Sequence, residues 1–124
     1  MIVVDSSGWL EYFADGKNAA AFAPAIQKPA NLIVPTLSIY EVFKRVLQQR
    51  DESEALQAVT AMLQGNLVEL TLPLALAAAK ISTETGLPMA DSVMLATARA
   101  FQAELWTQDS DFKSVEGAKY VPAR

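Results

Sequence analysis

The hydrophobic pattern begins with an apolar run, Met1–Val4, that is followed directly by Asp5 and two serines. A run of Ile and Val without a polar break predicts a strand that is buried on both faces, as in the middle of a parallel sheet. Asp-Ser-Ser is also typical of a helix N-cap, and the spacing of Trp9, Tyr12 and Phe13 predicts that a helix follows. Asp5 is therefore expected at the carboxyl end of a central strand, either as a metal ligand or as a cap.

The rest of the chain alternates between short apolar runs and longer segments with helical spacing. The expected strands are Met1–Val4, Asn31–Val34, Leu67–Leu72, Glu104–Thr107 and Lys119–Val121. The expected helices are Ser7–Asp15 (stopped by Gly16), Asn18–Lys28 (either kinked or split at Pro24), Thr36–Arg50, Asp51–Leu63, Pro73–Gly86 and Met89–Gln102 with Phe101 on its apolar face. Asp109–Lys113 is expected to form a turn or short helix. Strands that alternate with helices predict βαβ units, and hence a single α/β domain over 1–124 with a mostly parallel sheet.

Composition restricts the chemistry that this domain can carry out. In 124 residues, 52% are hydrophobic, which is enough apolar material for a core. The chain has no Cys and no His, so thiolate zinc sites, disulfides and Ser-His-Asp triads are excluded. No apolar run approaches the length of a membrane span and no leader opens the chain, so we expect a soluble, cytoplasmic protein. A net charge of −4 argues against coating nucleic acid by bulk positive charge.

Four acidic residues stand where this architecture would bring them to one edge of the sheet. Asp5 and Asp109 follow predicted strands, and Glu41 and Asp91 are expected in the first turns of predicted helices. Parallel strands carry their ligands at their carboxyl ends. Four like charges in one cleft would repel one another unless a cation neutralised them, and oxygen ligands without His or Cys favour Mg²⁺ or Mn²⁺.

Each of these residues has a purely structural alternative. Ser38 and Glu41 fit a capping box, in which Glu41 would bond the backbone of Ser38. Asp91 would complement a helix dipole, although it shares a face with the apolar stripe of its helix, where a lone carboxylate is costly. Asp109 could form an Asx-type turn or cap, and Asp111 could replace it as the fourth ligand.

Four segments together resemble the PIN domain family, in particular the VapC ribonuclease toxins. They are VVDSS at 3–7, LSIYEVFKR at 37–45, LPMADSVMLATA at 87–98 and LWTQDSDF at 105–112. The resemblance implies a three-layer sandwich in which helices flank a sheet of about five strands. It also implies that Asp5, Glu41, Asp91 and Asp109 hold Mg²⁺ or Mn²⁺, with Ser6 and Thr107 as polar neighbours.

The same resemblance implies a function. VapC-like proteins are metal-dependent endoribonucleases that cut RNA, often a tRNA or ribosomal RNA, usually as homodimers, and a VapB-like antitoxin holds them inactive. Metal-activated water would break the bond between the 3′-oxygen and phosphorus, leaving a 5′-phosphate and a 3′-hydroxyl. Lys44, Arg45 and Arg99 are the cations nearest in sequence to the acidic positions and are candidate contacts for substrate phosphates; the alternative for each is a place on a solvated helix face. The alternative is a catalytically idle PIN-like protein-interaction module.

Overall fold

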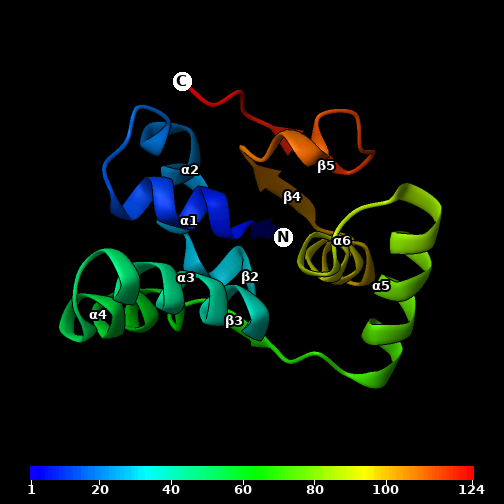
Figure 1. The fold of residues 1–124 in the computed structure, drawn as a ribbon, viewed down its shortest axis with the longest axis horizontal. Coiled ribbons are helices and arrows are strands. Elements are labelled where there is room, and N and C mark those ends of the chain that lie inside the picture. The colour runs from blue at the N-terminus through cyan, green and yellow to red at the C-terminus, as the bar shows by residue number, and fades with distance from the viewer.

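The computed structural model describes residues 1–124 as five strands and six α-helices (Figure 1). In chain order these are β1 Ile2–Val4, α1 Ser6–Phe13, α2 Ala19–Ile26, β2 Leu32–Pro35, α3 Thr36–Gln49, α4 Glu52–Met62, β3 Asn66–Val68, α5 Leu72–Thr85, α6 Met89–Ala100, β4 Glu104–Thr107 and β5 Ala118–Tyr120. The chain also forms two 3₁₀ turns, η1 Pro29–Asn31 and η2 Ser110–Phe112. None of these helices combines the length and the apolar character that crossing a lipid bilayer requires.

The sheet is parallel throughout, with strand order β3-β2-β1-β4-β5. The first strand lies in its centre, where Val3 pairs with Ile33 of β2 on one side and Leu105 of β4 on the other. The predicted parallel sheet around the first strand is confirmed. Strand order reverses at β1, and the crevice outside the carboxyl ends at such a point is where α/β proteins bind ligands.

Alternate residues of the central strands point to two separate cores, because side chains of a strand alternate between its faces. Val3, Ile33 and Leu105 pack with α5 and α6, whereas Val4 and Trp106 pack with α1 to α4. Figure 1 shows these two groups of helices on opposite sides of the sheet. The predicted three-layer sandwich is confirmed.

The predicted strand Leu67–Leu72 was wrong in its extent. The strand ends at Val68, and Leu70 and Leu72 are exposed. Thr71 caps α5, because its Oγ1 accepts the N–H of Leu74 at 3.4 Å. The strand is therefore shorter than its apolar residues suggested, because β3 lies at the sheet edge and Thr71 serves as the cap of α5.

Two predicted helix ends also differ from the structure. The first helix ends at Phe13, and Asp15 rather than Gly16 takes the left-handed conformation, with φ 51°. The sixth ends at Ala100, so Phe101 is its exposed C-cap and does not belong to the buried face. In both cases a residue with positive φ lies two positions after the last helical residue: Asp15 after α1, and Gln102, with φ 53°, after α6.

Candidate metal centre

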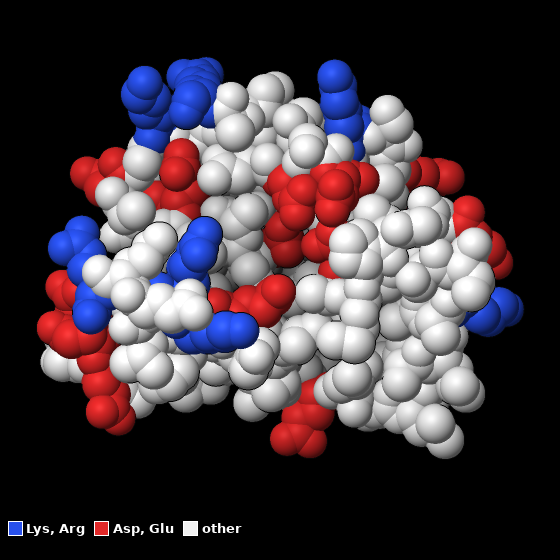
Figure 2. Space-filling view, viewed as in Figure 1, with Lys and Arg blue, Asp and Glu red and all other residues white.

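Acidic side chains gather at the carboxyl edge of the sheet. Figure 2 shows them in the middle of one face of the molecule, in a hollow over the region between β4 and α6. Asp5 follows β1, Asp109 follows β4, and Asp91 lies in the first turn of α6. Elements that are distant in sequence thus bring these side chains to one place.

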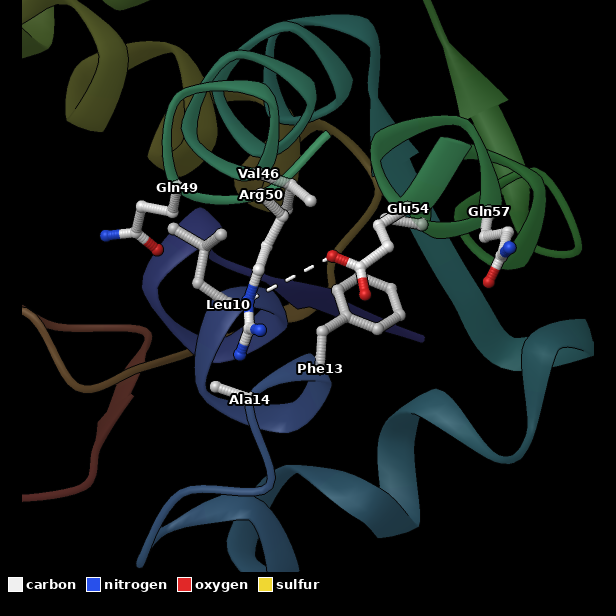
Figure 3. Close-up of a pocket in the computed structure, with 9 residues that line it drawn as sticks. Leu10, Phe13, Ala14, Val46, Gln49, Arg50, Glu54 and Gln57 are labelled. Atoms are coloured by element: carbon white, nitrogen blue, oxygen red, sulfur yellow. Dashed lines mark ion pairs between the residues drawn. The ribbon is translucent and has the colours of Figure 1, made fainter. Parts of the chain in front are cut away.

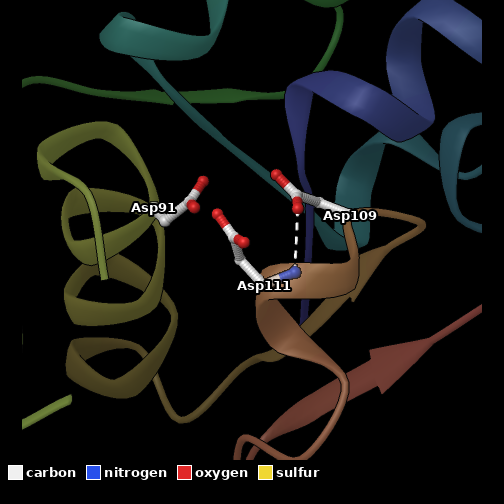
Figure 4. A group of neighbouring side chains, drawn as sticks. All are labelled: Asp91, Asp109 and Asp111. Carbon is white, nitrogen blue, oxygen red and sulfur yellow. Dashed lines mark hydrogen bonds between the residues drawn. The ribbon is translucent and has the colours of Figure 1, made fainter. Parts of the chain in front are cut away.

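Asp91, Asp109 and Asp111 form the tightest group. One carboxylate oxygen from each lies within 4.8 Å of the others (Figure 4). Asp91 is buried, Asp109 is half-buried and Asp111 is exposed. Asp109 is also the N-cap of η2, since its Oδ1 accepts the N–H of Asp111 at 2.9 Å. The Asx-type cap that was the structural alternative for Asp109 is therefore present. It does not exclude a metal-ligand role, because the capped turn places both Asp109 and Asp111 beside Asp91.

Asp5 is buried at the end of β1, with only 4% of its surface exposed. Its Oδ2 accepts hydrogen bonds from Thr107 Oγ1 and Ser7 Oγ, each at 2.9 Å. Asp5 occupies the N-cap position of α1, but its side chain makes no capping hydrogen bond. Its carboxylate is held by hydroxyl groups from two elements instead.

Glu41 is held by the other serine after β1. Its Oε1 accepts the hydroxyl of Ser6 at 2.6 Å. The structural alternative for Glu41, a capping box with Ser38, is excluded because α3 begins at Thr36. Ser38 therefore lies inside the helix, where it donates to Met94 Sδ at 3.1 Å. For the same reason Glu41 lies in the second turn of α3 and not in the first.

The pKa values of two carboxyl groups show how strongly these charges interact. Burial, hydrogen bonding to Asp111 and the negative charges of Asp5, Asp109 and Asp111 raise the pKa of Asp91 from 3.8 to about 8. Burial also raises the pKa of Asp5, and the charge of Glu41 adds to this, while the Thr107 and Ser7 hydroxyls oppose it. The negative charges of the other three carboxyl groups thus act on Asp5 and Asp91, and the five groups form one electrostatic network in which a cation would be favourable.

The donor set fits a hard divalent cation. It consists entirely of oxygen atoms, in a chain without His or Cys. Glu41 and Asp109 each use one carboxylate oxygen for the hydrogen bonds above, and the second remains available. Burial of like charges without a basic partner is costly unless an ion compensates them. The network therefore has the composition expected of a Mg²⁺ or Mn²⁺ site.

Sequence reasoning missed the part played by Ser7. Besides its bond to Asp5, its Oγ lies 3.3 Å from Thr107 Oγ1 and accepts the N–H of Gln108 at 3.2 Å. A serine two residues after a strand-end Asp is the only local signal for this role, and it is equally typical of a helix cap. The sequence predicted Asp111 only as a substitute for Asp109, whereas the structure places both beside Asp91.

A separate groove of about 480 Å³ lies between α1, α3 and α4. Figure 3 shows its lining, which includes Leu10, Phe13 and Val46, and the ion pair of 4.0 Å between Arg50 Nε and Glu54 Oε2. None of the five clustered carboxylates lines this groove. The candidate metal centre is therefore distinct from it.

Solved structures share the fold over nearly the whole chain. A toxin-antitoxin complex from Klebsiella pneumoniae aligns with a TM-score of 0.81 at 19% identity, covering 96% of each chain. The Mycobacterium tuberculosis toxin VapC20, described as cleaving the sarcin-ricin loop, aligns with a TM-score of 0.78 at 17% identity, covering 94% of this chain and 95% of that one. VapBC2 from Rickettsia felis, bound to a promoter DNA fragment, aligns with a TM-score of 0.75 at 12% identity, covering 97% and 98%.

Sequence comparison identifies the family. No curated protein sequence matches the chain. The family model of the PIN domain matches residues 2–118, which is most of the chain. It covers all the carboxylates of the candidate metal centre together with Ser6, Ser7 and Thr107. The chain therefore belongs to the PIN domain family.

Proposed function

We propose that this protein is a metal-dependent endoribonuclease and the toxin of a type II toxin-antitoxin pair. The observation that carries the proposal is the network of Asp5, Glu41, Asp91, Asp109 and Asp111 at the carboxyl edge of the sheet. Membership of the PIN domain family supports it, as does the likeness to a toxin described as cleaving the sarcin-ricin loop.

In this mechanism the carboxylates would hold the metal ion, and the hydroxyl groups of Ser6, Ser7 and Thr107 hold two of the carboxylates. A bound Mg²⁺ or Mn²⁺ supplies Lewis acidity, which activates water and neutralises charge on the phosphoryl oxygens. Asp5, Glu41, Asp91 and Asp109 are the proposed ligands, and Asp111 is close enough to share that role. Water then forms a bond to phosphorus as the bond to the 3′-oxygen breaks, and the 3′-oxygen takes up a proton. The products are a 5′-phosphate and a 3′-hydroxyl.

Glu41→Gln is the sharpest test of this proposal. The Gln amide oxygen still accepts the Ser6 hydroxyl, so the fold is kept while the negative charge is removed. We expect RNA cleavage in Mg²⁺ to fall on the order of 100-fold, the size of effect found when one charge-stabilising group is removed. Glu52→Gln, at an exposed position of α4, is the matched control. Cleavage by Glu41→Gln at the wild-type rate would disprove the ligand role.

The competing hypothesis, an idle PIN-like protein-interaction module, differs in metal binding. An active centre binds Mn²⁺ saturably in a calorimetric titration, and Asp5→Asn and Asp91→Asn lose that binding. A folded wild-type protein that takes up no Mn²⁺ would favour the idle module.

The proposed partners are RNA and a VapB-like antitoxin. One structure of the same fold is described as a toxin-antitoxin complex. A small adjacent reading frame whose product co-purifies with this chain would identify the antitoxin. Sequencing of RNA ends after brief induction of the toxin would show whether a tRNA or ribosomal RNA is cut. A cytoplasmic location and a homodimer are part of the same proposal.

A further inference from the structure

Helix α3 carries a charged and aromatic surface directly beside the metal centre. Its sixth residue, Glu41, is fixed inward by the Ser6 hydroxyl. Tyr40, Lys44 and Arg45, on the same stretch of helix, are exposed. We call these three residues the α3 strip.

Helical geometry places both cations near the direction of Glu41. Lys44 and Arg45 are three and four residues after it, so they flank it one turn along the helix, about 5.4 Å further on. Figure 2 shows basic side chains close to the acidic centre on the side where Figure 1 places α3. An RNA strand that reaches Glu41 is therefore within reach of two positive charges.

Tyr40 adds an aromatic ring that the core does not use. The Tyr40 side chain is 59% exposed and is not part of either hydrophobic core. Lys44 Nζ lies 5.7 Å from the centroid of the Tyr40 ring. An exposed ring beside a cation is what proteins present to single-stranded nucleic acid, because any base can stack on the ring while the cation meets the phosphate.

The overall charge makes a local positive surface necessary. The chain carries −4, and the metal centre itself is acidic, so RNA is repelled unless cations lie close to the cut. The predicted contact Arg99 does not fill this need, because it lies in the last turn of α6, at the opposite end of the helix from Asp91, and donates to the backbone oxygen of Glu116 at 3.3 Å.

We propose that the α3 strip binds single-stranded RNA next to the metal centre. A base stacks on Tyr40, and Lys44 and Arg45 bind backbone phosphates on the strand that leads to Glu41. This inference rests on the proposed nuclease function and adds the surface that receives the substrate and the single-stranded form of the RNA.

Binding without cleavage tests the inference. The probe is a fluorescein-labelled 12-nucleotide oligouridylate, measured by fluorescence anisotropy in EDTA over a series of salt concentrations. We expect Lys44→Gln/Arg45→Gln to weaken binding about 10-fold or more and to reduce the slope of log K against log salt by about 0.7 for each phosphate that is no longer neutralised. Tyr40→Leu weakens binding several-fold with little change in slope, and Tyr40→Phe keeps it.

The matched control is Lys28→Gln/Lys80→Gln, which removes two exposed cations from α5 and the segment after α2. Equal losses of affinity in this pair and in the strip variants would overturn the inference, as would unchanged binding in the strip variants. Competition by duplex RNA as strong as by single strands would overturn the single-stranded part. Strip variants that bind RNA normally but fail to bind the antitoxin would assign the surface to the protein partner instead.

Different measurements test the nuclease proposal and the α3 strip, so that failure of one can be distinguished from failure of the other. Absence of Mn²⁺ binding and of RNA cleavage in the wild-type protein refutes the nuclease, whereas the anisotropy measurement requires neither. A wild-type protein that cleaves RNA, together with strip variants that cleave and bind it equally well, would refute only the strip.

Discussion

Three hydroxyl side chains hold two carboxylates of the candidate metal centre in place. Ser6 binds Glu41, while Ser7 and Thr107 bind the same oxygen of Asp5. Hydroxyl donors favour the ionised form of a carboxylate and fix its orientation, as outer-shell partners do in metal sites. Since Ser7 also accepts the N–H of Gln108, one hydroxyl joins the segment after β1 to the segment after β4.

Replacement of Ser7 tests this arrangement at the scale of a single residue. Ser7→Ala leaves Asp5 Oδ2 with Thr107 as its remaining hydroxyl partner and leaves the N–H of Gln108 without its acceptor. We expect the affinity for Mn²⁺ to fall about 10- to 100-fold and the free energy of unfolding to fall by about 1 kcal/mol. Calorimetric titration and urea unfolding measure the two effects.

The control for Ser7→Ala is the conservative variant Ser7→Thr. Because it keeps a hydroxyl group, we expect its affinity for Mn²⁺ to be close to that of the wild-type protein. Ser53→Ala on the exposed face of α4 changes neither quantity. A Ser7→Ala protein with wild-type metal affinity would show that the hydroxyl is not needed to position Asp5.

The raised pKa of Asp91 predicts how stability depends on pH in the metal-free protein. Because the pKa in the folded state is about 8 and the ordinary value is 3.8, the folded chain holds this proton more tightly than the unfolded chain. The stabilising contribution is complete below the ordinary value and disappears as the pH rises through about 8. The raised pKa of Asp5 acts in the same direction.

Urea unfolding in EDTA at a series of pH values checks this prediction. The wild-type free energy of unfolding falls between about pH 4 and about pH 8, and Asp91→Asn flattens that fall. Saturating Mg²⁺ also removes it, since the ion takes the place of the proton. An equally steep wild-type and Asp91→Asn profile would show that another group controls the change.

At the scale of elements, the first helix must approach the sheet closely to deliver its two serines. Gly8 is buried in α1, and a Cβ there would lie 2.7 Å from Phe22 Cδ1 and 2.8 Å from Val4 Cγ1. Phe22 and Val4 are both fully buried and cannot swing away. The absence of a side chain at Gly8 therefore sets how near α1 lies to α2 and β1.

Gly8→Ala is expected to destabilise the protein by about 1–3 kcal/mol through overpacking and to weaken Mn²⁺ binding by shifting α1. Thermal and urea unfolding measure the first effect, and calorimetry the second. Gly8→Ala combined with Phe22→Leu provides the control, because shortening the ring makes room for the methyl group. If the losses in unfolding free energy of Gly8→Ala and Phe22→Leu simply add in the double variant, the close contact between position 8 and Phe22 does not limit the approach of α1.

The layers of the fold were predictable from sequence, and several of its boundaries were not. Uninterrupted Val and Ile in β1 and β2 predicted the buried central strands, and the 3.6-residue period predicted α3 and α6. The end of β3 depended on Thr71 as a cap, and the absence of the Ser38 capping box depended on α3 starting three residues earlier than that box requires. These outcomes are decided by short-range competition for hydrogen bonds, which composition does not reveal.

The candidate metal centre was predictable as a set of carboxylates, since strand ends and helix starts can be found in the pattern. Its contacts were not, because Ser6 meets Glu41 across 35 positions and Thr107 meets Asp5 across 102. Pairings of that kind follow from the order of strands in the sheet. Asp111 joined the group because a 3₁₀ turn brings it back toward Asp91.

At the scale of the whole molecule, the outer face of α5 is unusually apolar. Leu72 is 72% exposed and Leu76 is 59% exposed, and exposed apolar patches mark protein interfaces. We expect the proposed homodimer to use this face. Leu76→Glu should then give a monomer in sedimentation velocity, because the interface would bury an unpaired charge.

Leu56→Glu on α4, where the side chain is 51% exposed, is the matched control and should leave the dimer intact. A wild-type protein that sediments as a monomer at all concentrations would refute the dimer. If the Leu76→Glu variant still sediments as a dimer, the dimer interface does not include this face of α5.

The position of β1 in the middle of the sheet also has a consequence for biosynthesis. The ribosome makes Asp5 first, yet the strand before it needs β4, residues Glu104–Thr107, as its neighbour, and Thr107 as a partner for the carboxylate. The acidic centre therefore assembles only after β4 and the segment that follows it have been synthesised and have packed against β1. A growing chain that has not yet reached these residues has no complete centre, so the proposed ribonuclease would be inactive until then.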